Sequence, residues 1–155
     1  MSNVIDSFYN AFQHLDAEKM VSCYHPEIEF EDPAFGKLKG ERAKNMWRML
    51  CASQKGKDFR VIYNIVEVNK ETAKASWEAF YTFSQTNRKV HNKISASFVI
   101  KDGLIIQHVD DFNLHDWSKQ ALGFKGFILG KSNFFKKQLN QQTNHLLDKF
   151  EQNSH

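Results

Sequence analysis

The sequence predicts a single α+β domain in which helices pack against one face of a curved antiparallel sheet, and three observations support this prediction. Apolar residues recur at helical spacing along the chain up to Leu50. From Phe59 to Asp111 the pattern changes to that of strands, with four long apolar runs separated by short polar turns. No internal repeat or linker interrupts the 155 residues, so we expect one domain over residues 1–155.

Two helices are expected at the start of the chain. Ser2 or Asn3 can cap the first, and one apolar stripe identifies it: Val4, Ile5, Phe8, Ala11, Phe12 and Leu15. The second is expected to begin at Asp16 and to continue to Tyr24. His25-Pro26 should end it, because the residue before a proline is disfavoured in helical conformation.

A half-exposed strand and a third helix are expected next. Acidic and apolar residues alternate over 27–32, which is typical of a strand with one buried face. Asp32-Pro33 and Phe35-Gly36 then indicate a turn or loop. After Gly40 a helical stripe is formed by Ala43, Met46, Trp47 and Leu50, and the polar residues 53–57 are expected to form a loop.

Four strands in meander order are expected in the second half of the chain. They are predicted at residues 59–68, 72–85 and 89–101 and from Leu104 onward. The turns between them carry Asn69, Asn87 or Asp102-Gly103, residues that favour tight reversals of the backbone.

The region after Trp117 is predicted as an extension that contains one long helix. Residues 118–123 should form a helical turn that ends at Gly123, and residues 126–130 an irregular apolar loop. Ser132 is expected to cap the final helix, whose apolar stripe holds Phe135, Leu139, Leu146 and Phe150. We interpret this helix as a packing or oligomer surface rather than a membrane anchor, because its polar face is only modestly basic.

Composition limits the classes of function. Phe, Tyr and Trp make up 14% of the residues, and 14 of them are Phe, which favours an aromatic-lined cavity or interface. The net charge is +3 with both signs intermixed and no long run of Lys or Arg, so we expect no nucleic-acid partner. No stretch approaches the length and apolarity of a membrane span, so we expect no membrane partner. Cys23 and Cys51 have no metal-ligand spacing, and the first residues lack the pattern of a signal peptide, so we expect a cytoplasmic protein.

Most of the candidate chemistry lies in the segment from Leu104 to Trp117. Alternation along a strand places Leu104, Ile106, His108, Asp110 and Phe112 on one face. That face passes from aliphatic residues through His-x-Asp to an aromatic residue, as the wall of an apolar pocket with a polar floor would. A second interpretation stays open, in which the strand leaves the core near His108 and its acids are solvated.

Several of these motifs together resemble the SnoaL-like branch of the NTF2-like superfamily. They are the aromatic-rich first helix, Phe30-Glu31-Asp32-Pro33, the helix after Gly40, the meander, and the tail Asp110-Asp111-Phe112-Asn113 followed by Gln120-Ala121-Leu122-Gly123. The resemblance covers about residues 2–123, which leaves 124–155 as a C-terminal extension. It implies a cone-shaped, cystatin-like α+β fold with an apolar pocket between helix and sheet, and a homodimer formed through the outer face of the sheet.

The resemblance also implies candidate site residues. Asp32 matches the general base of the superfamily's ketosteroid isomerases through its Glu-Asp-Pro context, although a turn cap before proline is an alternative interpretation. The two oxyanion donors of those isomerases fall on Phe8 and near Ala96, which have no donor group, so this site is incomplete. Tyr9, next to Phe8, should point elsewhere on the helix.

In SnoaL-like cyclases a His and an Asp do acid/base work without a metal or cofactor, and His108 and Asp110 are our candidates for these roles. Asn113 occupies a second acidic position of the family's tail pattern, which weakens the match there. The candidate ligand-binding residues are Phe12, Tyr24, Phe30, Trp47, Tyr81, Phe98 and Phe112, for each of which simple core packing is the alternative.

Three functional hypotheses follow. The first is a cofactor-free acid/base enzyme, an isomerase, cyclase or hydrolase acting on a small apolar carbonyl or epoxide compound. The second is a non-catalytic module that binds an apolar metabolite or a protein partner in the same pocket. The third is metal-dependent hydrolysis by His108, Asp110, His115 and Asp116, which we disfavour because His108 and His115 fall on opposite faces of a continuous strand.

Overall fold

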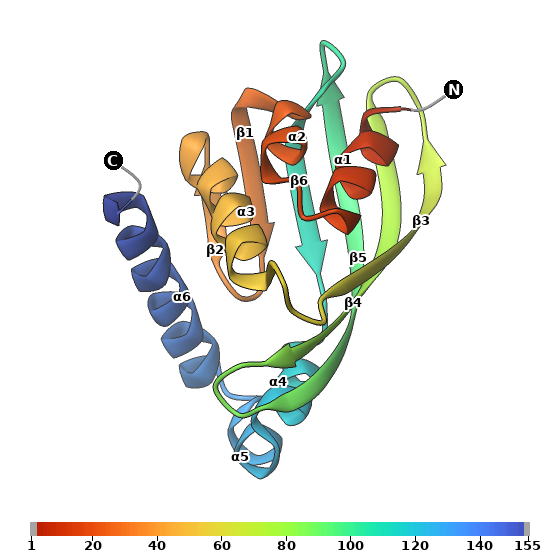
Figure 1. Cartoon of the computed structure of the whole chain (residues 1–155). Coiled ribbons are helices and arrows are strands. Elements are labelled where there is room, and N and C mark those ends of the chain that lie inside the picture. The colour runs from red at the N-terminus through yellow and green to blue at the C-terminus, as the bar shows by residue number, and fades with distance from the viewer. Residues whose placement is uncertain (1–2, 154–155) are drawn as a thin grey trace.

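The computed structural model describes residues 3–153, and within them helices and strands occur largely in separate runs, as the α+β prediction requires (Figure 1). In chain order the elements are α1 (Val4–Gln13), α2 (Ala17–Ser22), β1 (Tyr24–Asp32), β2 (Gly36–Lys39), α3 (Glu41–Gln54), β3 (Arg60–Val68), β4 (Thr72–Phe83), β5 (Arg88–Lys101), β6 (Leu104–Asp111), α4 (Leu114–Leu122), α5 (Phe124–Leu129) and α6 (Asn133–Asn153).

One sheet of six strands organises the domain, in the order β2-β1-β6-β5-β4-β3. The predicted meander is confirmed, because β3 to β6 pair antiparallel with their chain neighbours. The sheet also holds one parallel pairing, which brings β1 beside β6 and aligns Phe30 with His108. This pairing joins the two halves of the chain, since the segment with Asp32 and the segment with Asp110 become neighbours.

Helices α1, α2 and α3 cover one face of the curved, open sheet (Figure 1). Their starts follow the sequence signals: the Asn3 side chain accepts the N–H of Asp6, and Asp16 accepts the N–H of Lys19. The apolar stripe of α1 enters the core completely, with Ile5, Phe8 and Phe12 inaccessible to solvent. Aromatic edge-to-face contacts fill the space between α1, α3 and the sheet, such as Phe12 with Trp47 at 5.1 Å.

Four predicted elements differ from the observed ones. The second helix ends at Ser22, so Tyr24 begins strand β1 and His25-Pro26 lies within that strand. Residues 36–39 form β2 rather than a loop. Residues 124–129 form helix α5 where an irregular loop was expected, and α4 begins at Leu114, earlier than predicted. Each difference concerns a short element or an element boundary, which local sequence patterns define least well.

A bulge changes the inner face of β6. The register with β5 shifts between Val99 and Ile100, so Ile105 is fully buried while Ile106 is only half-buried. The predicted placement of Ile106 on the inner face is therefore wrong. His108 and Asp110 do share the inner face, with 0% and 4% exposure, and the interpretation in which these two side chains are solvated is also wrong.

The C-terminal helix α6 is hydrogen-bonded to the turn that follows Asp32. The side-chain amide of Asn140 donates to the carbonyls of Pro33 (2.8 Å) and Ala34 (2.9 Å), and the amide of Asn144 donates to Phe35 (2.9 Å). Arg42 of α3 pairs with Glu151 farther along the helix. The extension is thus held against the domain by these polar contacts and by Leu147, which is fully buried in the core.

No helix among residues 3–153 is long and apolar enough to span a bilayer.

We expect Asn140→Ala to lower the free energy of unfolding by about 1–2 kcal/mol, because two backbone carbonyls lose a donor. Gln141→Ala, at an exposed neighbouring position of the same helix, is the matched control and should change stability by less than about 0.5 kcal/mol. Urea denaturation followed by circular dichroism measures both. Equal stabilities of the two variants would contradict this account of how α6 is held.

Candidate active site

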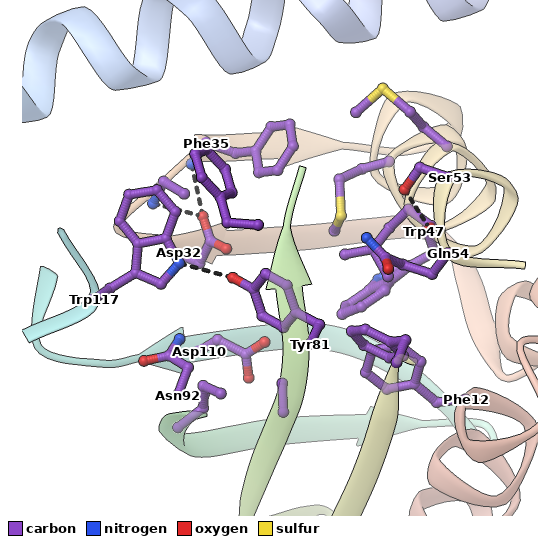
Figure 2. A pocket seen from close by; sticks show the side chains of 18 of the residues that line it. Phe12, Asp32, Phe35, Trp47, Ser53, Gln54, Tyr81, Asn92, Asp110 and Trp117 are labelled. Carbon is purple, nitrogen blue, oxygen red and sulfur yellow. Dashed lines mark hydrogen bonds between the residues drawn. The ribbon is translucent and has the colours of Figure 1, made fainter. Parts of the chain in front are cut away.

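A cavity of about 580 Å³ lies between the inner face of the sheet, α3 and α6 (Figure 2). Its walls are mainly apolar, and two carboxyl groups and a phenol, those of Asp32, Asp110 and Tyr81, line it. In Figure 2 these three side chains point into the cavity from the end of β1, from β6 and from β4. The structure therefore brings two of the three candidate catalytic residues, Asp32 and Asp110, to one apolar space.

Asp32 is half-buried where β1 ends. Its Oδ1 accepts the backbone N–H groups of Ala34 (3.0 Å) and Phe35 (2.7 Å), so the Asp-Pro motif does form a turn cap. Burial raises the pKa of Asp32 to about 7, the charge of Asp110 adds to this, and the two backbone hydrogen bonds only partly oppose it. Asp32 therefore caps a turn, and its raised pKa is compatible with the role of general base, which stays a prediction.

His108 lies behind the cavity wall rather than in it. Its Nε2 is 2.8 Å from Oδ1 of Asp110, and its Nδ1 is 2.7 Å from the hydroxyl of Tyr24. The same hydroxyl accepts the indole N–H of Trp47 (2.8 Å), and the indole N–H of Trp77 reaches Asp110 (3.2 Å). His108 is fully buried, so it acts on the cavity only through Asp110.

One assignment of protons satisfies every group in this chain. Trp47 donates to the Tyr24 oxygen, so the Tyr24 hydroxyl hydrogen is free to donate to Nδ1 of His108. The neutral imidazole then donates from Nε2 to Asp110, which accepts as a carboxylate. This network holds the Asp110 carboxylate in one orientation at the cavity wall.

Tyr81 of β4 supplies a hydroxyl to the cavity lining. The indole N–H of Trp117 donates to the Tyr81 oxygen at 2.7 Å, which leaves the hydroxyl hydrogen available to a ligand. Burial raises the pKa of Tyr81, and the bond from Trp117 works against that rise, because it favours the phenolate form. The indole of Trp117 thus polarises the Tyr81 hydroxyl, and no pattern in the sequence indicated this contact.

The candidate ligand-binding residues divide into two groups. Phe12, Trp47, Tyr81 and Phe112 line the cavity. The other three, Tyr24, Phe30 and Phe98, do not line the cavity, in contrast to the sequence prediction. All three pack around the His108 ring, with Phe98 at 4.4 Å, Phe30 at 5.1 Å and Tyr24 at 6.1 Å between ring centroids.

Several residues of the site escaped the sequence interpretation. Trp77 and Trp117 provide the indole donors, and Leu146 and Phe150 of α6 close one side of the cavity. The apolar stripe of α6 was visible in the sequence, but nothing there indicated which surface it covers. Tyr9, which was expected to point away from the Phe8 position, is fully buried and stacked on Tyr63, and within residues 3–153 its hydroxyl has no hydrogen-bond partner.

The two positions that lack a hydrogen-bond donor, Phe8 and Ala96, are both buried in the core. Phe8 stacks on Tyr24, with ring centroids 5.4 Å apart, and Ala96 is a buried residue opposite Asp110 on β5. Asn113, at the second acidic position of the tail pattern, caps α4 by accepting the N–H of Asp116.

The proposed metal ligands do not converge. In the described part of the chain, no group of three or more His, Cys, Asp or Glu side chains is placed to hold a metal ion. Nε2 of His115 lies 3.0 Å from the Phe127 carbonyl oxygen, away from Asp110 and the cavity.

The chain belongs to the SnoaL-like domain family, whose profile matches residues 5–108. Comparison with curated proteins gives no match. The family match covers α1 through His108, which includes Asp32 and the parallel pairing of β1 with β6, and it ends just before Asp110.

Solved structures support the same fold at low sequence identity. A candidate polyketide cyclase from Silicibacter sp. is 18% identical with a TM-score of 0.62, covering 76% of this chain and 92% of that one. A candidate isomerase from Bacillus subtilis is 15% identical (TM-score 0.61; 77% and 90%). An LEH-like epoxide hydrolase from M. tuberculosis is 18% identical (TM-score 0.54; 82% and 88%). At these identities the likeness establishes the NTF2-like fold and no activity.

Tyr24→Phe should lower the free energy of unfolding by about 1–3 kcal/mol, because the buried Trp47 N–H and His108 Nδ1 both lose their partner. Tyr63→Phe removes a hydroxyl that bonds Asp6 in a half-buried position and serves as control, with an expected loss of less than about 1 kcal/mol. Urea unfolding monitored by tryptophan fluorescence compares them. A Tyr24→Phe protein as stable as the wild type would show that the network contributes nothing.

The pKa of Asp32 makes stability depend on pH in a defined direction. The folded protein binds this proton up to pH about 7, whereas an ordinary carboxyl with a pKa of 3.8 loses it earlier. The stabilising contribution of this group is therefore present below pH 3.8 and is lost as the pH rises towards about 7. Asp32→Asn lacks this loss, so from pH 5 to pH 8 its Tm should rise by several degrees relative to that of the wild type.

Thermal melts of both proteins across this range test the expectation, with Asp111→Asn as the control at an exposed position of β6. Parallel Tm curves for the wild type and Asp32→Asn would mean that the pKa of Asp32 is not raised.

Proposed function

We propose that the protein is a cofactor-free acid/base enzyme that acts on a small apolar carbonyl or epoxide compound. One observation carries the proposal: Asp32, a carboxyl with a pKa of about 7, faces the same apolar cavity as Asp110, which is fixed by the buried His108. A group with this pKa is present in both protonation states near neutral pH, so it can take a proton and return it.

The proposed chemistry uses the carboxyl group of Asp32 and the hydroxyl group of Tyr81. With a carbonyl substrate, the Asp32 carboxylate removes a proton from the carbon next to the carbonyl, and the C–H bonding pair moves into an enolate. The Tyr81 hydroxyl donates a hydrogen bond to the developing oxyanion, a role that Phe8 and Ala96 cannot fill. The protonated Asp32 then returns a proton to the same carbon or, where a neighbouring C=C bond makes the anion a dienolate, to the γ carbon of that dienolate. With an epoxide, a carboxylate takes a proton from water while the water oxygen bonds to a ring carbon and the C–O bond of the ring breaks. Tyr81 hydrogen-bonds the ring oxygen as it becomes an alkoxide, and the protonated carboxyl group returns the proton to give the diol.

Burial is the main cause of the raised pKa of Asp32, and the neighbouring Asp110 adds to it. His108 is then a positioning residue, because it is fully buried and touches Asp110 rather than a ligand. Phe12, Trp47 and Phe112 are proposed to contact the apolar part of the substrate.

A second candidate function uses the same cavity without chemistry. The absence of donors at Phe8 and Ala96 favours a binding module for an apolar metabolite or a protein partner. In that case the two carboxyls would serve only to orient a polar end of the ligand.

Two further proposals concern the oligomeric state of the protein and its location in the cell. The outer face of the sheet, with Ile62 at 43% exposure, is proposed to form a homodimer. Cys23 and Cys51 are free and buried, which supports the proposed cytoplasmic location.

The decisive experiment exposes the protein in D2O to a panel of small cyclic ketones and, separately, epoxides. Deuterium incorporation next to the carbonyl and diol formation are measured by NMR and mass spectrometry. Asp32→Asn should lower the rate on any active compound at least about 100-fold, because general acid/base catalysis is lost. Asp111→Asn, which removes an exposed carboxyl from the same sheet, should leave the rate unchanged.

The outcomes separate the two functions. Undiminished turnover by Asp32→Asn would eliminate Asp32 as the base. Binding without turnover, with an affinity that survives Asp32→Asn but is lost in Phe112→Ala, would establish the binding module instead.

A further inference from the structure

Helix α5 presents small residues to α4 and large apolar residues to solvent. Gly126 and Gly130 are buried, and a Cβ atom on either would overlap Ser118 of α4. The Ser118 hydroxyl also contacts the Gly126 carbonyl oxygen at 3.1 Å, so the two helices approach closely on this side. Because only glycine fits against α4, the larger residues of α5 must occupy the opposite side.

These outward residues form what we call the α5 patch, which consists of Phe124, Phe127, Ile128, Leu129 and, at the start of α6, Phe134. Each is between 51% and 76% exposed, whereas almost all other large apolar side chains of the domain are buried or half-buried. The patch lies at the end of the molecule where α5 meets α6, remote from the β5–β6 turn (Figure 1). Exposed apolar residues gathered within eleven positions indicate a contact surface.

The charge around the α5 patch has one sign. No Asp or Glu occurs from residue 117 to residue 147, and five of the chain's 21 basic residues lie there. Among them Lys125, Lys131, Lys136 and Lys137 are exposed and form no salt bridge with any described residue. The rest of the chain carries a net charge of −2, so positive charge is concentrated in residues 117–147.

We propose that the α5 patch docks on an anionic lipid surface. Phe, Ile and Leu side chains enter the boundary between headgroups and acyl chains, and lysines around them contact anionic headgroups. A second copy of the chain fits less well, because a symmetric contact would bring the same lysines together. Nucleic acid would engage the lysines but leave Ile128 and Leu129 in water. The proposal revises the expectation of no membrane partner, since the exposure of α5 follows from its helical fold.

Sedimentation of the full chain with unilamellar vesicles tests this proposal. We expect binding to phosphatidylcholine vesicles that contain about 30% phosphatidylserine, weak binding to phosphatidylcholine alone, and release in about 0.5 M NaCl. The double variant Phe127→Ser/Ile128→Ser should lower the partition coefficient at least about tenfold. Lys136→Gln/Lys137→Gln should lower it about tenfold on anionic vesicles only.

Matched controls make the result specific. Val66→Ser/Val68→Ser removes two exposed apolar side chains from β3, and Lys70→Gln/Lys101→Gln removes two exposed lysines at the opposite end; both should bind as the wild type does. Circular dichroism checks that each variant folds. Failure to bind anionic vesicles, or equal losses in control and patch variants, would overturn the proposal. A dimer in analytical ultracentrifugation that only Phe127→Ser/Ile128→Ser dissociates would assign the patch to self-association and also overturn it.

Discussion

The buried hydrogen-bond chain from Trp47 through Tyr24 and His108 to Asp110 is the interaction on which the rest of the site depends. It links α3, β1 and β6, and Trp77 of β4 joins it at Asp110. A fully buried imidazole without partners would be strongly destabilising, so the aromatic core and these donors have to be present together. The same constraint that stabilises the centre of the fold also presents one carboxylate to the cavity in a fixed orientation.

At Asp32 two opposing effects act on one carboxyl group. The backbone N–H groups of the turn favour its charged form, while removal from water and the charge of Asp110 favour its neutral form, and the second pair prevails. The turn is itself held by α6, whose Asn140, Thr143 and Asn144 side chains donate to its carbonyls. The C-terminal extension therefore belongs to the site, because it closes the cavity and supports the segment that positions Asp32.

The region beyond the family match contributes groups to both the cavity and the surface. Residues 5–108 provide the common fold, whereas Asp110, Trp117, α5 and α6 lie after it. The phenol of Tyr81 obtains its polarising partner from α4, and the glycines of α5 direct aromatic residues outward at the same end of the molecule. Changes confined to this C-terminal third can thus alter both what the cavity does and what the surface contacts, with the common scaffold unchanged.

Local patterns in the sequence determined the α+β class, the meander, the cap at Asp16 and the inward direction of His108 and Asp110, because hydrophobic period and capping act over a few residues. Only the tertiary structure decided that Tyr24 is a strand residue bonded to His108, that Phe30 and Phe98 lie behind the cavity rather than in it, and that α6 closes one side. Those facts depend on the parallel pairing of β1 with β6 and on contacts between residues about 80 to 110 positions apart, to which no local preference refers.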